Sequence, residues 1–172
     1  YGRSYLDRSD SISLYAPELP LKRGEIVPTS STLAGCIADA GPDAWGRRIL
    51  EYRRHPAGTD LGPLAYLLGA GSDRIGALDL QERPDEHVVR RGGEAPLSEL
   101  AEAADRVERG LPLSPGLEVA LVRGSSVGGA RPKVLLSDGD RHLIAKFSST
   151  TDVSPVVKAE FVAMELARLV GL

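Results

Sequence analysis

The sequence predicts an α+β fold. Two strand-like runs flank Ser137-Asp138-Gly139-Asp140, and Asp-Gly between such runs is the strongest short-range signal for a β-hairpin, here over residues 133–147. Apolar residues recur at helical spacing over residues 96–109 and 155–170, and a glycine suited to end a helix follows each stretch. The chain has 172 residues, 42% of them hydrophobic, which is enough for one to one and a half domains.

Two further strands and a long loop are expected in the N-terminal part. Alternating Ser, Ile, Ser, Leu and Tyr predict a half-buried strand at Ser11–Tyr15. The run Ile75–Leu80 predicts a second strand. The polar stretch Arg83–Pro96, which holds two glycines and two prolines, predicts a loop.

The remaining elements of the N-terminal part are expected to be short helices. Leu33–Ala40 and Asp43–Arg54 predict two helices that Gly41-Pro42 separates, and Asp43 is a candidate N-cap because its side chain can accept a backbone N–H. A helical turn is expected at Leu64–Leu68, where Gly69 and Gly71 follow.

The hairpin sorts its side chains into two faces, because successive side chains of a strand point to opposite sides. If Asp138 and Gly139 are the turn residues, Leu136 lies opposite Arg141 and Val134 opposite Leu143. The face expected to cover the core carries Val134, Leu136, Leu143, Ala145 and Phe147. The other face carries Lys133, Leu135, Ser137, His142, Ile144 and Lys146.

Lys146 and Glu160 are predicted to form an ion pair. The neighbours of Lys146 in the strand are apolar, and a buried ammonium without a partner is costly. Glu160 lies on an apolar face of the 155–170 helix with no cation one turn away, whereas Glu165 has Arg168 three residues later. A purely structural tie between helix and hairpin remains the alternative to a functional pair.

Residues 124–133, Gly-Ser-Ser-Val-Gly-Gly-Ala-Arg-Pro-Lys, form a Gly-rich segment directly before the hairpin. Small residues let backbone N–H groups approach an anion, and hydroxyls and cations add donors, so the segment is a candidate phosphate-binding loop. It fits neither the Walker A spacing nor G-x-G-x-x-G, and a flexible turn is the alternative. The order of loop, strand, lysine-bearing strand and glutamate-bearing helix is nevertheless the order that kinases use.

These residues resemble HipA-type serine/threonine kinases of bacterial toxin-antitoxin systems. The resemblance rests on Ser125–Lys133, Ile144–Phe147 and Lys158–Glu160, and upstream on Asp39–Arg48 and Gly71–Leu80. It covers nearly the whole chain. It implies an N-terminal α+β subdomain over residues 1–112, followed over residues 113–172 by part of a protein-kinase-like N-lobe, a hairpin plus an αC-like helix, without the C-lobe.

The resemblance also implies roles for individual residues. Glu160 would orient Lys146, and Ser126 would be the autophosphorylated serine, with Ser125 as the open alternative. The cofactors would be ATP and Mg²⁺, but the catalytic and metal-binding residues are expected downstream of this chain, which alone should be inactive. The residues expected to bind nucleotide are Val127, Gly128, Gly129, Ala130, Arg131, Lys133 and Lys146.

By the same resemblance, the full-length protein would phosphorylate a translation-related protein, such as an aminoacyl-tRNA synthetase. Its partner would be a HipB-like helix-turn-helix antitoxin that supplies the DNA binding. A non-catalytic module that contacts a kinase or an antitoxin is the alternative function.

Composition excludes several other classes. A net charge of -3 argues against direct binding to nucleic acid or membrane surfaces, which need an excess of Lys and Arg. No apolar run approaches the roughly 18 residues of a membrane span. A single cysteine and the lack of a signal-like start favour a cytoplasmic location. Because the chain starts at Tyr1 and stops where a helix ends, we expect a fragment.

The remaining chemistry-bearing residues have structural interpretations. His55, His87 and His142 are far apart and lack ligand spacing, so no metal site is expected. Cys36 is expected to be a small core residue rather than a nucleophile. Trp45 is expected to anchor its helix, with nearby arginines on the wet face, rather than form a stacking patch.

Overall fold

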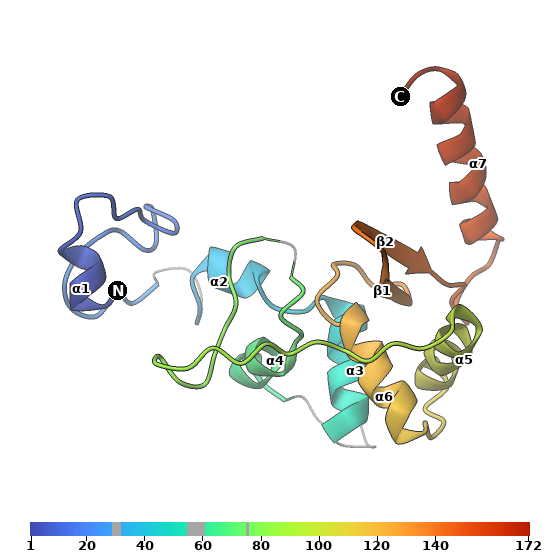
Figure 1. The fold of residues 1–172 in the computed structure, drawn as a ribbon, viewed down its shortest axis with the longest axis horizontal. Helices are drawn as coiled ribbons and strands as arrows, with labels where there is room; N and C mark the ends of the chain where they lie inside the picture. The colour runs from blue at the N-terminus through green and yellow to red at the C-terminus, as the bar shows by residue number, and fades with distance from the viewer. Residues whose placement is uncertain (29–31, 55–60, 75) are drawn as a thin grey trace.

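The structure is a computed structural model of the chain, and it describes all residues except 29–31, 55–60 and 75 (Figure 1). It combines helices with one two-stranded antiparallel sheet, which agrees with the predicted α+β class at this coarse level. In chain order the elements are α1 (Arg3–Leu6), α2 (Gly35–Asp39), α3 (Ala44–Arg54), α4 (Pro63–Gly69), α5 (Leu97–Glu108), α6 (Pro115–Leu121), the 3-10 turn η1 (Val122–Gly124), β1 (Lys133–Asp138), β2 (Arg141–Lys146) and α7 (Val156–Leu169).

The five predicted helices are present, at α2, α3, α4, α5 and α7, and the loop expected over residues 83–96 is irregular up to the start of α5. Gly110 and Gly171 follow α5 and α7 with φ of 67° and 80°, the left-handed conformation that glycine adopts most easily after a helix. The sequence prediction missed α1, α6 and η1. Pro115 is the first residue of α6, and the Ser114 hydroxyl accepts the Leu117 N–H, which is ordinary helix-start chemistry.

The strand predicted at Ser11–Tyr15 is wrong. This stretch has only an isolated bridge between Tyr15 and Leu19. Tyrosine side chains take the place of a partner strand: the Tyr5 hydroxyl bonds both the N–H and the carbonyl of Ile12, and the Tyr1 hydroxyl accepts the Leu14 N–H. Because side chains satisfy these backbone groups, the alternating pattern does not produce a strand here.

The strand predicted at Ile75–Leu80 is also wrong over residues 76–80, while Ile75 lies outside the described residues. Arg90 binds this segment with its side chain, donating to the Leu80 carbonyl at 2.7 Å and to the Asp79 carboxylate at 2.6 Å. The Arg90 guanidinium therefore supplies a hydrogen bond to this backbone that a neighbouring strand would otherwise supply.

The hairpin is present, but its turn is one residue later than predicted. Asp138 pairs with Arg141, Leu136 with Leu143 and Val134 with Ala145, so Gly139 and Asp140 form the turn. Gly139 has φ of 59°, and no described non-glycine residue has a positive φ, so the glycine alone takes the left-handed conformation. Each β1 residue therefore pairs with a β2 residue two positions further along the chain than predicted. A shift of two residues leaves every side chain on its predicted face of the hairpin.

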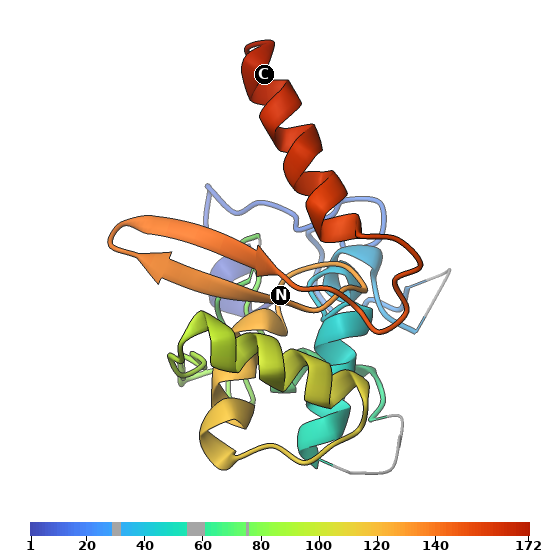
Figure 2. The same cartoon turned by 90° about the vertical axis from the view of Figure 1, so that its right-hand side faces the viewer.

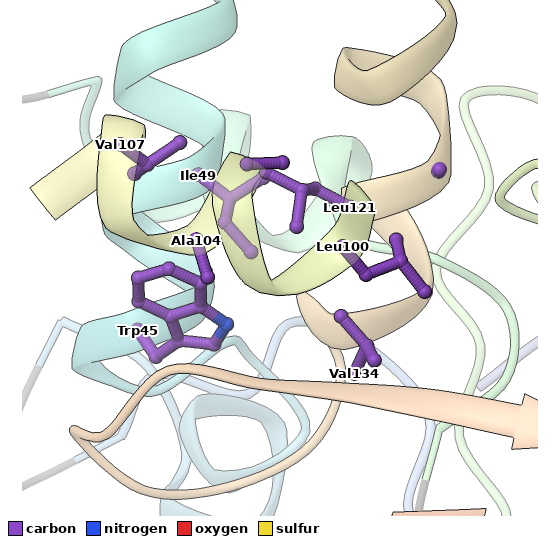
Figure 3. Close-up of a cluster of buried hydrophobic side chains, with 9 residues drawn as sticks. Trp45, Ile49, Leu100, Ala104, Val107, Leu121 and Val134 are labelled. Carbon is purple, nitrogen blue, oxygen red and sulfur yellow. The ribbon is translucent and has the colours of Figure 1, made fainter. Parts of the chain in front are cut away.

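The main core lies between α3, α5, α6 and one face of the hairpin (Figure 3). Trp45, Leu121 and Val134 are at most 1% exposed, and Leu136, Ala145 and Phe147 pack against the cluster from the predicted core face of the hairpin. This one core therefore includes residues from both sides of position 112. The close-up labels Trp45, Ile49, Leu100, Ala104, Val107, Leu121 and Val134.

Helix α7 projects away from the hairpin and the core helices in both views (Figures 1 and 2). None of its residues is buried. Phe161, Met164 and Leu166 are each more than half exposed. None of the helices in the described ranges has the length and apolar character needed to cross a membrane.

Candidate functional site

The Gly-rich segment is attached to the first turn of α3. Trp45 donates its backbone N–H to the Gly129 carbonyl at 3.3 Å and its indole N–H to the Lys133 carbonyl at 2.8 Å. Asp43, the residue before α3, accepts the Gly129 N–H at 2.5 Å. Asp43 thus stands at the predicted N-cap position, but its carboxylate binds the Gly-rich segment.

Lys133 has a buried ammonium. The residue is 5% exposed, and its Nζ has no hydrogen-bond partner among the described residues. The Gly-rich segment covers it closely: a Cβ built on Gly129, whose φ is 106°, would lie 2.7 Å from Nζ. Burial lowers the pKa of Lys133, the charge of Asp43 raises it, and the charges of Lys146 and Arg131 lower it further.

Lys146 forms an ion pair with Glu160, as the sequence predicts, and the pair joins β2 to α7. Both side chains are 42% exposed, so the expectation that Lys146 is buried is wrong. Lys133 lies directly opposite Lys146 in the hairpin and is the buried member of the two. Two ammonium groups on one face of a ribbon repel each other, and Glu160 compensates only the outer one. The nucleotide-orienting role of the pair stays a prediction.

Arg131 is held by Asp152. The guanidinium donates to both carboxylate oxygens, at 2.6 and 2.5 Å, and these hydrogen bonds lower the pKa of Asp152. This bidentate pair fixes the Gly-rich segment to the loop before α7. Of the other residues expected to bind nucleotide, Val127 is buried, whereas Gly128, Gly129 and Ala130 are exposed.

The two serines of the Gly-rich segment clamp Gly71. The Ser125 hydroxyl accepts the Gly71 N–H at 3.2 Å and donates to the Val122 carbonyl at 2.7 Å. The Ser126 hydroxyl donates to the Gly71 carbonyl at 3.0 Å and lies 3.3 Å from the Asp73 carboxylate, whose pKa is raised by burial. Ser125 is 0% exposed and Ser126 is half-buried, so Ser126 has the more accessible hydroxyl of the two.

A cavity of about 600 Å³ lies beyond this clamp, between described residues of the 72–94 region and β1. Asp73 and Arg123 line it together with both described histidines, His87 and His142. The described residues contain no group of three or more His, Cys, Asp or Glu side chains arranged to hold a metal ion.

The sequence predicts structural rather than chemical roles for Trp45 and Cys36. Trp45 is fully buried and Arg47 and Arg48 are exposed, which confirms the anchoring interpretation. The expectation that Cys36 is a small core residue is wrong, because it is half-buried on α2 and belongs to neither core cluster of the described residues.

Sequence reasoning missed the part that Asp43 plays at the Gly-rich segment. An acceptor, a buried indole and Gly46 follow one another in Asp43-Ala44-Trp45-Gly46, and a Cβ on Gly46 would collide with the Ser125 carbonyl. The signal that the sequence offers is the small residue Gly46 beside Trp45, and it can be interpreted only once the fold brings together Asp43 and Gly129, which are 86 positions apart.

Comparison with known proteins does not place the chain in a family: no family model, curated protein or solved structure matches it.

Proposed function

We propose that the Gly-rich segment binds the phosphates of a nucleotide. The buried Lys133 ammonium carries the proposal, because a charge held away from water without a partner is several kcal/mol less stable than one that meets an anion. The exposed N–H-bearing residues Gly128 and Ala130, together with Lys146 across the hairpin, add donors and positive charge to the same place. An anion there would compensate Lys133, whose ammonium has no hydrogen-bond partner among the described residues, whereas Lys146 is already paired with Glu160.

The order of elements and the resemblance support a more specific proposal, the N-terminal part of a HipA-type serine/threonine kinase. The hairpin and α7 would then be part of a kinase N-lobe, with Glu160 orienting Lys146 toward ATP-Mg²⁺. The full-length protein would act in the cytoplasm on a protein substrate, with a helix-turn-helix antitoxin as its partner. Ser126 would be the modified serine, since its hydroxyl is more accessible than that of Ser125.

Calorimetric titration of the chain with ATP tests the proposal. Lys133→Met should weaken binding at least tenfold, since a hydrogen bond to a charged group contributes about 1.5–3 kcal/mol. Lys158→Met is the matched control, because Lys158 is an exposed lysine on α7. Equal affinity in all three proteins, or no ATP binding at all, would contradict the proposal.

A non-catalytic interaction module is the second candidate, and the exposed apolar side chains of α7 favour it. In that case the Gly-rich segment would be a structural turn. The same titration separates the two, because an interaction module needs no affinity for ATP.

A further inference from the structure

A negatively charged side chain already lies against the glycines of the Gly-rich segment. Asp43 accepts the Gly129 N–H through Oδ2 at 2.5 Å. A Cβ added to Gly128 would lie 3.0 Å from the same oxygen. The carboxylate therefore binds the backbone of Gly129 and occupies the space beside Gly128, where a phosphate oxygen would be expected to bind.

The buried ammonium of Lys133 borders the same place. A Cβ on Gly129 would lie 2.7 Å from Lys133 Nζ, and Asp43 is the carboxylate whose charge acts on Lys133. No hydrogen bond joins Lys133 to Asp43, because Lys133 Nζ has no such partner among the described residues. Asp43 thus compensates Lys133 through space and leaves its donors free for another anion.

We propose that Asp43 is an internal competitor of the phosphate: its carboxylate holds the Gly129 N–H until an incoming phosphate displaces it. This inference rests on the proposed function and adds a control element to it. Two hydrogen bonds from α3 to the segment, donated by the backbone and indole N–H groups of Trp45, involve no formal charge. They keep the segment in place when the carboxylate moves away.

Asp43→Asn separates the two properties of this side chain. The amide oxygen can still accept the Gly129 N–H, whereas the negative charge is gone. A phosphate then no longer meets a like charge within a few ångströms, and the affinity for ATP should rise about tenfold at low ionic strength. The gain should shrink in high salt, because part of the carboxylate is exposed and screened.

Titration of the wild type, Asp43→Asn and Asp105→Asn with ATP and with inorganic triphosphate, each with and without Mg²⁺, tests the inference. Asp105→Asn removes one negative charge from the surface of α5 and should leave the affinity unchanged. Tighter binding by Asp43→Asn alone is the expected result. Unchanged binding overturns the inference, and so does weaker binding confined to Mg²⁺, which would make Asp43 a metal ligand.

The outcomes separate the inference from the function on which it rests. If the wild type binds ATP and Asp43→Asn binds no tighter, only the competitor role fails. If neither protein binds ATP or triphosphate, both fail. If Asp43→Asn folds poorly, a measurement on the wild type still tests the inference. The carboxylate ¹³C resonance of Asp43 should move on addition of triphosphate. A resonance that stays in place at saturation contradicts displacement of the carboxylate.

Discussion

Replacing Lys133 by methionine should make the protein more stable while removing its proposed anion site. Lys133 is 5% exposed, and its Nζ has no hydrogen-bond partner among the described residues. An unsatisfied buried polar group costs about 1–3 kcal/mol, and methionine fills a similar unbranched volume without that cost. Part of this gain is lost with the attraction of Asp43, so we expect Lys133→Met to raise the free energy of unfolding by about 1–2 kcal/mol at pH 7.

The pH dependence gives an independent check. Burial lowers the pKa of Lys133 in the folded protein, so in the range between that lowered pKa and the ordinary value near 10.4 the unfolded chain binds more protons. Wild-type stability should therefore rise with pH across this range, and it should be lowest where Lys133 is charged in both states. Lys133→Met lacks this contribution, so its advantage should decrease as the pH rises.

Urea unfolding followed by circular dichroism at pH 7 and pH 9.5 measures both effects. Lys158→Met should change the free energy of unfolding by less than about 0.5 kcal/mol, since Lys158 is an exposed lysine. The interpretation of Lys133 as a buried charge without a hydrogen-bond partner is refuted if Lys133→Met is clearly less stable than the wild type at pH 7. It is also refuted if the difference between the two proteins grows with pH.

Three further substitutions test the contacts around the site, each by urea unfolding. Trp45→Phe removes the indole N–H bound to the Lys133 carbonyl and part of a fully buried ring, so it should lower the free energy of unfolding by about 3 kcal/mol. A loss below about 1 kcal/mol would contradict the anchoring role of Trp45. Gly46→Ala should lower the free energy of unfolding by about 2 kcal/mol or more, because the new Cβ would collide with the Ser125 carbonyl. The control Gly116→Ala, at the open start of α6, should be neutral or stabilising. Similar changes in stability for the two variants would rule out the close approach of Gly46 to Ser125. Glu160→Gln should lower the free energy of unfolding by less than about 1 kcal/mol, because the side chains of Glu160 and Lys146 are each 42% exposed, yet it should weaken ATP binding. A large loss of stability would indicate a purely structural pair.

The hairpin shows what the sequence can and cannot predict. Its position and both faces are predicted correctly, although the turn is one residue later, because a pairing change of two residues preserves the alternation of side chains. The helices are predicted because proline, glycine and apolar spacing act locally. The strands at residues 11–15 and 76–80 are wrong because a strand needs a partner, and tyrosine and arginine side chains bind these segments instead.

At the candidate site, the pairing of Lys146 with Glu160 is predicted, but Lys146 is partly exposed, and Lys133 is the buried lysine. Neighbouring residues in the strand favour a buried Lys146, whereas burial depends on what covers the strand in three dimensions. The Gly-rich segment folds over Lys133, and α7 reaches only the outer lysine. The clamp of Ser125 and Ser126 on Gly71 was equally unpredictable, since it joins residues more than 50 positions apart.

The most direct test of the central claim is an NMR titration of the isotope-labelled chain with ATP. Binding of phosphate at the Gly-rich segment predicts saturable shifts of the Gly128, Gly129 and Ala130 amides and of the Lys133 side-chain Nζ. Lys133→Met should suppress the amide shifts. Shifts that gather instead around the 72–94 cavity, or no shifts at millimolar ATP, would contradict the claim that residues 124–133 bind nucleotide phosphates.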